Sequence, residues 1–281
     1  MHVYISVDME GIGGIATTDQ TTRGGHGYPR AQELMTGETN AAIAGAFDAG
    51  AEQVTVSDSH GTMDNLIHER LDERARLVFG SPRAQCMAHG LSSDFELAMF
   101  VGYHAAVGEV GVLSHTFSGL FNGFRLNGQT VSEAEVNALY AATHSVPVGL
   151  VTGDNIICAV AEKQFPGVVT VPVKQAEGWT AANSLHPATA RAAIRAAAAR
   201  AVAQAAAVRP VLIPDRLVLD VQMQVPSATE LAAGVPGAEQ IDAFTVRCEL
   251  ADPAELLDLV NVWYNLAAIA MRGRLSLLDR R

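Results

Sequence analysis

The sequence predicts an α/β fold in which a mostly parallel sheet is covered by helices on both faces, giving three layers, with a smaller α+β domain after it. Short runs of apolar and β-branched residues alternate along the chain with segments typical of helices. These runs are continuously apolar, which is typical of strands buried on both faces. After Lys174 the composition shifts towards alanine and proline. We therefore predict a larger α/β domain over residues 1–175 and a smaller α+β domain over residues 176–281.

The expected elements follow in chain order. In the first domain, strands are predicted over residues 2–7, 53–57, 97–102, 147–152 and 168–173. A helix over residues 31–49, closed by Gly50, should connect the first two strands. The pair Asn127-Gly128 is typical of a two-residue hairpin turn, and a helix should follow from Ser132. The second domain should contain an alanine-rich helix over 187–208, strands over 217–224 and 241–249, and a final helix over 253–271.

Composition and charge narrow the classes of function. The 281-residue chain is 49% hydrophobic, so it can bury a large core, and its net charge is −11. This acidity argues against nucleic acid or an anionic membrane as a partner. The three cysteines lie far apart and form no CxxC pair, so neither a zinc ribbon nor a disulfide framework is expected. With no signal-peptide pattern and no apolar stretch of membrane-spanning length, the expected location is the reducing cytoplasm.

Two carboxylates follow the first predicted strand. Asp8 and Glu10 are two residues apart, so in an extended chain their side chains point to the same side. Like charges at that distance repel, and burying them is costly. A divalent cation would offset both effects, whereas a solvated loop with Glu10 free remains the alternative.

The next strands end in a similar way. Asp58 and His60 follow the second strand, and the third strand leads directly into His104. Sites in open α/β sheets collect at the carboxyl ends of the strands. Several neighbouring strand ends that each carry an acid or a histidine are therefore expected to form one site.

Two further residues complete the candidate set. His115 follows His104 closely enough to return to the same edge of the sheet. Ser132 and Glu135 have the spacing of a capping box, in which the acid has a structural role. Glu133 has no such role, so we predict that Glu133 rather than Glu135 faces the site.

The donor types indicate the metal. Carboxylate oxygen with imidazole and no thiolate suits zinc, with manganese or cobalt as alternatives. Five donor side chains are more than one tetrahedral zinc ion binds, and they fit two ions bridged by a carboxylate. Asp8 is the expected bridge. Glu10 and His60 would complete one site, and His104 and Glu133 the other. Asp58 would either orient a histidine or cap a turn.

The sequence resembles the zinc-dependent D-aminopeptidases associated with bacterial dipeptide-transport operons. Each matching element is weak alone, but together they are highly specific, and the resemblance extends to about residue 272. The matching elements are Ser6-x-Asp8-x-Glu10-Gly11, Asp58-Ser59-His60, Gly102-Tyr103-His104, Ser114-His115, Val131-x-Glu133 with Asn137-Ala138, Gly153-Asp154 and Val173-Lys174-Gln175.

The resemblance implies a function and an assembly. It implies two zinc ions per subunit, held at Asp8, Glu10, His60, His104 and Glu133, and a catalytic histidine at His115. The expected reaction is hydrolysis of the N-terminal peptide bond of short peptides, often those that begin with D-alanine, by a metal-activated water. The expected assembly is a homodecamer of two stacked pentameric rings.

Other functions fit the same donors. The alternatives are another metal-dependent amidohydrolase, an L-aminopeptidase, or a non-enzymatic peptide-binding accessory of a transporter. A structural metal site would be closed, so His115 beside the ligands favours catalysis. The glycines that follow Glu10 do not have the GxGxxG order, and a flexible turn is expected there rather than a nucleotide site.

Overall fold

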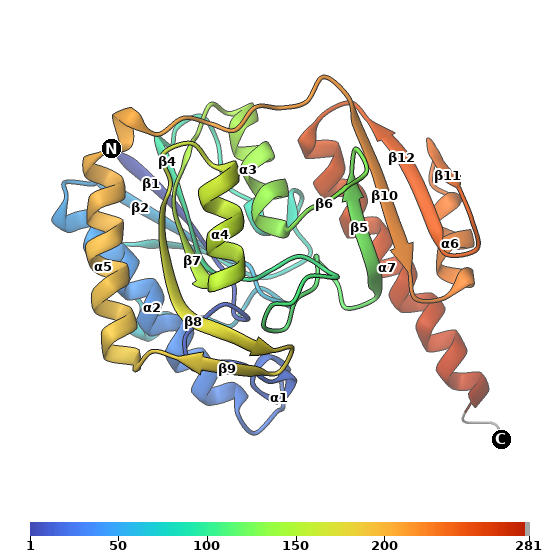
Figure 1. The fold of residues 1–281 in the computed structure, drawn as a ribbon, viewed down its shortest axis with the longest axis horizontal. Coiled ribbons are helices and arrows are strands. Elements are labelled where there is room, and N and C mark those ends of the chain that lie inside the picture. The colour runs from blue at the N-terminus through green and yellow to red at the C-terminus, as the bar shows by residue number, and fades with distance from the viewer. Residues whose placement is uncertain (279–281) are drawn as a thin grey trace.

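This computed structural model describes residues 1–278. A seven-stranded sheet, whose strands lie between residues 2 and 184, forms the centre of the larger part of the molecule (Figure 1). All neighbouring strands are parallel except the last pair, so the predicted mostly parallel sheet is confirmed. The strands lie in the order β3 (Arg76–Val78), β2 (Gln53–Asp58), β1 (His2–Val7), β4 (Leu97–Tyr103), β7 (Val148–Asp154), β8 (Val169–Gly178) and β9 (Ala181–Ser184).

Helices cover both faces of this sheet. The side chains of Val3 and Ile5 on β1 pack in one apolar cluster with α2 (Tyr28–Asp48) and α5 (Pro187–Ala203). Tyr4 points to the opposite face, which is covered by α3 (Glu133–Thr143) and α4 (Asn155–Gln164). The three predicted layers are therefore confirmed. A short helix, α1 (Thr18–Thr21), and 3-10 turns at His68–Arg70, Cys86–Ala88 and Ala205–Ala207 lie in the connections.

A second, antiparallel sheet lies beside the first (Figure 1). Its helices, α6 (Pro226–Ala233) and α7 (Pro253–Leu278), contact its strands and each other, and Trp263 of α7 is fully buried. None of the described helices has the length and apolar character that crossing a lipid bilayer requires. The strands lie in the order β11 (Ala238–Gln240), β12 (Thr245–Leu250), β10 (Leu217–Met223), β5 (Phe121–Leu126) and β6 (Gln129–Thr130).

The strand predicted over residues 241–249 is confirmed over residues 245–249 and wrong over residues 241–244. The Asp242 carboxylate accepts hydrogen bonds from the backbone N–H groups of Phe244 and Thr245 and so closes a turn. The chain therefore divides into β11 and β12, which pair with each other. The alanine-rich helix also ends at Ala203, before the predicted residue 208.

The two sheets do not follow the order of the chain. Strands β5 and β6, which form the predicted Asn127-Gly128 hairpin, pair with the second sheet although they precede β7 and β8. Helix α5 follows residue 176 but packs against α2 on the first sheet. The domain boundary near residue 175 stays a prediction.

The loop after β1 is held by buried polar side chains. The Lys174 ammonium donates to the backbone carbonyls of Glu10, Ile12 and Ile15, and the Glu38 carboxylate accepts from the N–H of Gly13. Lys174 and Glu38 are both almost fully buried. The backbone that carries Glu10 is thus fixed from two sides.

Glu38 should make the stability of the fold depend on pH. Burial raises the pKa of Glu38 to about 7, against the opposing effect of the Gly13 hydrogen bond. A glutamate whose pKa is higher in the folded than in the unfolded state stabilises the fold fully at a pH below the unfolded pKa. This stabilisation is lost as the pH rises through the folded pKa, which is about 7 for Glu38. Full ionisation would cost at most roughly 3 kcal/mol.

The variant Glu38→Gln should therefore gain stability relative to the wild type between pH 5 and pH 8, because glutamine stays neutral and keeps an acceptor for Gly13. Urea unfolding of both proteins at the two pH values, in matched metal, measures the difference. A constant difference in the free energy of unfolding would contradict this account of Glu38.

Candidate metal centre

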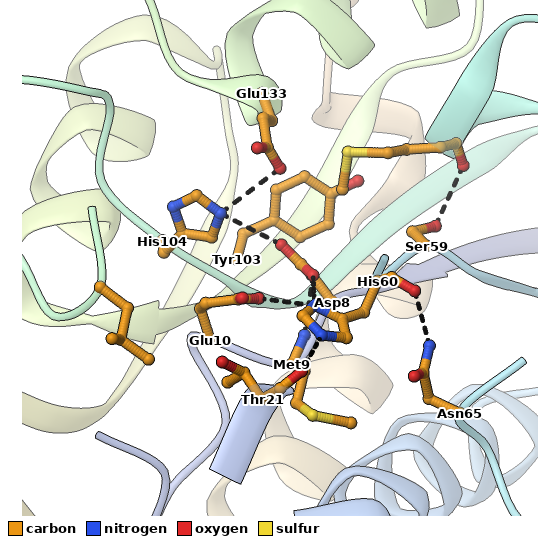
Figure 2. A network of polar contacts seen from close by, with 12 residues as sticks. Asp8, Met9, Glu10, Thr21, Ser59, His60, Asn65, Tyr103, His104 and Glu133 are labelled. Carbon is orange, nitrogen blue, oxygen red and sulfur yellow. Dashed lines mark hydrogen bonds and ion pairs between the residues drawn. The ribbon is translucent and has the colours of Figure 1, made fainter. Parts of the chain in front are cut away.

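The carboxyl ends of three adjacent parallel strands bring the predicted side chains together. Asp8 and Glu10 follow β1, His60 follows β2, and His104 follows β4. The strand ends approach closely: the N–H of Asp8 donates to the carbonyl of Val101, 2.8 Å away. Figure 2 shows the Asp8 carboxylate between the two imidazole rings.

Asp8 lies at the centre of the cluster. One of its carboxylate oxygens is 3.3 Å from Nδ1 of His60, and the other is 3.3 Å from Nε2 of His104. The Glu10 carboxylate lies 2.9 Å from the same Nδ1 of His60. Asp8 is 3% exposed and Glu10 is 5% exposed, so both charges are withdrawn from solvent. This is the central position that the sequence predicted for a bridging carboxylate.

Glu133, the first residue of α3, reaches the cluster from the other side. Its Oε2 atom lies 3.4 Å from Nε2 of His104, and its Oε1 atom accepts the backbone N–H of Phe117 at 2.5 Å. Glu135 instead accepts hydrogen bonds from the N–H and hydroxyl of Ser132, whose hydroxyl accepts the N–H of Glu135. The predicted capping box is confirmed, and Glu133 is the glutamate that faces the site.

His115 lies beside His104. The two imidazole rings stack with their centres 4.3 Å apart and their planes 10° apart. Nε2 of His115 is 3.8 Å from Oε1 of Glu133, and the side chain is 25% exposed. His115 is therefore the more accessible of the two histidines, at the edge of the buried cluster.

Hydrogen bonds to backbone carbonyls orient all three rings. His104 donates from Nδ1 to the carbonyl of Ala105, and His115 donates from Nδ1 to that of Leu113. His60 donates from Nε2 to the carbonyl of Thr21. In each ring the other nitrogen then faces the carboxylates, and once it has lost its proton it is placed as in metal-ligating histidines.

Charge is concentrated in the cluster. Burial lowers the pKa of His104, but the charge of Glu133 and the contact with Asp8 outweigh it and raise that pKa well above its ordinary value. Burial raises the pKa of Asp8, but the contacts with His104 and His60 outweigh this effect and lower the pKa to about 2. The three carboxylates thus require positive charge nearby. Protons on the rings supply it, and a divalent cation would release those protons on binding.

Asp58, for which two roles were expected, is part of a turn. Its carboxylate accepts hydrogen bonds from the backbone and side-chain N–H groups of Asn65 and from the backbone N–H of Leu66. Asn65 in turn donates to the carbonyl of His60. Asp58 therefore fixes the loop that carries His60 without touching the imidazole.

A polar network lies below the cluster. The Tyr103 hydroxyl is 2.7 Å from the Ser6 hydroxyl and accepts from Nδ2 of Asn137, and the Ser6 hydroxyl contacts that of Ser59. Gly102, near the end of β4, has a φ of +72°, and a Cβ there would lie 2.3 Å from the backbone oxygen of Asp8. Only glycine permits this close approach of the two strand ends.

A cavity of about 370 Å³ opens onto the cluster. Asp8, His60, His115 and Glu133 are among the residues that line it. Sequence reasoning missed several other lining residues, because a loop arginine and polar positions on a long helix look like ordinary surface. These residues include Arg83, Asn261 and Tyr264.

The donor set fits divalent zinc. The candidate ligand atoms of Asp8, Glu10 and His104 lie within 4.8 Å of one another, as do those of His104, His115 and Glu133. Nε2 of His104 is buried and has no hydrogen-bond partner, although it faces two carboxylates. An unpartnered buried nitrogen is costly, and a shared cation would satisfy it.

Known proteins are similar to this chain in sequence and fold. A family model described as D-aminopeptidase matches residues 1–262. A D-aminopeptidase from Bacillus subtilis (strain 168) is 36% identical over 268 residues, which cover 95% of this chain and 98% of that relative. The solved structure of the Zn-dependent D-aminopeptidase DppA from Bacillus subtilis, described as a self-compartmentalizing protease, has a TM-score of 0.92 at 35% identity and covers 95% of this chain and 98% of its own. The matches confirm the resemblance of the sequence, and the chain belongs to the D-aminopeptidase family.

Proposed function

We propose that this protein is a zinc-dependent aminopeptidase that hydrolyses the N-terminal peptide bond of short peptides beginning with a D-amino acid, D-alanine foremost. The observation that carries the proposal is the buried cluster in which the Asp8 carboxylate lies between His60 and His104. The family match and the zinc dependence of the DppA relative support the same reaction.

Five side chains would hold the metal. Asp8 would bridge two zinc ions, with Glu10 and His60 on one side and His104 and Glu133 on the other. When bound, zinc supplies Lewis-acid polarisation of a carbonyl and lowers the pKa of a coordinated water. Manganese or cobalt would suit the same oxygen and nitrogen donors.

His115 would supply proton transfer beside the metal ligands. Its hydrogen bond to Leu113 leaves Nε2 free to accept a proton and then return it to the departing amine. Stacking on His104 fixes the plane of the ring, so the proton moves at a defined position.

The assembly and location extend the proposal. We propose a homo-oligomer, because the DppA relative is described as self-compartmentalizing. The decamer is the specific assembly that the resemblance of the sequence implies. We also propose a cytoplasmic location, which suits three cysteines that are all free thiols. Short peptides, rather than nucleic acid or membrane, would be the partners.

Hydrolysis of paired peptides tests the reaction and its stereochemistry. D-alanyl-D-alanine and L-alanyl-L-alanine are incubated with the zinc-loaded protein, the chelated protein and the chelated protein with zinc restored, and free alanine is measured. We expect release from the D-peptide that chelation abolishes and zinc restores. Equal cleavage of both peptides would identify a non-selective aminopeptidase, and no release from either would favour a peptide-binding accessory.

Glu133 and Glu135 offer a matched pair of variants. Glu133→Gln should lower zinc affinity and activity by more than the roughly 10–100-fold that follows loss of an outer hydrogen-bond partner, because it removes a charged ligand. Glu135→Gln should keep both, since glutamine also completes a capping box. Zinc titration and peptide hydrolysis on the two variants measure this. Equal effects of the two substitutions on zinc affinity and activity would mean that Glu133 is not a zinc ligand.

A further inference from the structure

One permanently charged cationic side chain lines the cavity beside the candidate metal cluster. Of the described residues that line it, Arg83 is the only lysine or arginine. Asp8, His60, His115 and Glu133 of the cluster line the same cavity. At about 370 Å³ it has the size of a pocket for a small molecule, roughly 300–1,000 Å³.

No carboxylate of the described residues forms an ion pair with the Arg83 guanidinium, although the buried Asp58 carboxylate acts on it from a greater distance. Its Nη2 and Nη1 atoms donate to the backbone carbonyls of Asp58 and Val78, at 2.7 and 3.3 Å, and its Nε atom is buried without a hydrogen-bond partner. By contrast, Arg74 and Arg247 pair with nearby aspartates at the surface. A guanidinium has five N–H groups, so three of those of Arg83 remain for a ligand.

Helix α7 holds the loop that carries Arg83. Nδ2 of Asn261 donates to the backbone carbonyl of Arg83 at 2.9 Å, and the carboxylate of Asp258 accepts the backbone N–H of Gln85 at 3.2 Å. The two hydrogen bonds to backbone carbonyls restrict the orientation of the guanidinium. Arg83 is therefore set in position before any ligand arrives, which reduces the entropy cost of binding.

We propose that Arg83 binds the C-terminal carboxylate of the peptide substrate. The inference rests on the proposed function, in which the N-terminal end of the peptide is cleaved at the metal cluster. A short peptide with its amine there presents its carboxylate farther along the same cavity. Guanidinium is the side chain best suited to bind a carboxylate, through two parallel hydrogen bonds. Arg83 would thus select short peptides with a free acid end.

The test compares a free acid with its amide. Kinetic constants are measured for D-alanyl-D-alanine and D-alanyl-D-alaninamide with the wild type, Arg83→Met, Arg83→Lys and the control Arg30→Met, which alters an exposed arginine on α2. In Arg83→Met, the ratio of kcat/KM for the acid to that for the amide should fall by about 10–100-fold, mainly through KM. In Arg83→Lys the ratio should fall less, because lysine keeps the charge. In Arg30→Met the ratio should equal that of the wild type.

An unchanged ratio in Arg83→Met, whether or not both rates fall, would overturn the inference, because a purely structural role affects both substrates alike. Calorimetric binding of the two peptides to zinc-loaded His115→Ala, with and without Arg83→Met, gives a readout that needs no hydrolysis. Tighter binding of the acid than of the amide, lost with Arg83→Met, would support the carboxylate site even if no peptide were cleaved. Equal binding of acid and amide would refute it.

Discussion

Replacing Asp8 with asparagine is expected to remove zinc and peptidase activity together. Asp8 contacts both His60 and His104, so its two oxygens lie between the two halves of the cluster. Asparagine has nearly the same shape but lacks the charge and one of the two oxygen donors. The loss of activity should exceed the roughly 10²–10³-fold that removal of a single electrostatic donor costs.

The measurement is the zinc content of the purified variant together with its rate on D-alanyl-D-alanine. Asp242→Asn serves as a control, because Asp242 caps an exposed turn far along the chain. It should retain wild-type zinc and rate even where its stability falls. An Asp8→Asn protein that kept its full zinc content and rate would show that Asp8 is not a shared ligand.

Replacing His115 with alanine should separate catalysis from metal binding. Loss of a general acid–base typically costs about 10²–10⁴-fold in rate, whereas Asp8, Glu10, His60, His104 and Glu133 would all remain to hold zinc. The variant should therefore keep its zinc and lose most of its kcat. The KM should change little, because the ring acts on the proton rather than on the bound peptide.

Zinc analysis and steady-state kinetics of His115→Ala, beside His68→Ala as an exposed-histidine control, check this expectation. The position of His115 next to His104 and Glu133 makes a ligand role the competing explanation. Loss of zinc on His115→Ala would establish that role. Retention of both zinc and rate would remove His115 from the mechanism.

Much of the sheet and the cluster could be predicted from sequence, because both depend on local pattern. Continuous apolar runs mark buried parallel strands, and the residues that directly follow them must share one edge of the sheet. Asp8, His60 and His104 were found in this way. The capping-box spacing also separated Glu133 from Glu135, since helix capping is decided within four residues.

The remaining features depend on contacts between distant segments. In the sequence Arg83 looks like part of a surface loop. Its contact with α7 comes from Asn261, which lies 178 residues later in the chain. The carbonyl of Thr21 that orients His60 carries no side-chain signal at all. The pairing of β5 with β10 likewise joins segments that composition assigned to different domains. Such long-range contacts leave no periodic pattern in the sequence.

The most direct test of the metal site is diffraction from zinc-loaded crystals, recorded on both sides of the zinc absorption edge. We predict two anomalous peaks per subunit, one bound by Glu10 and His60, the other by His104 and Glu133, with the Asp8 carboxylate touching both. Peaks only elsewhere on the protein, or none among these five side chains, would contradict the account.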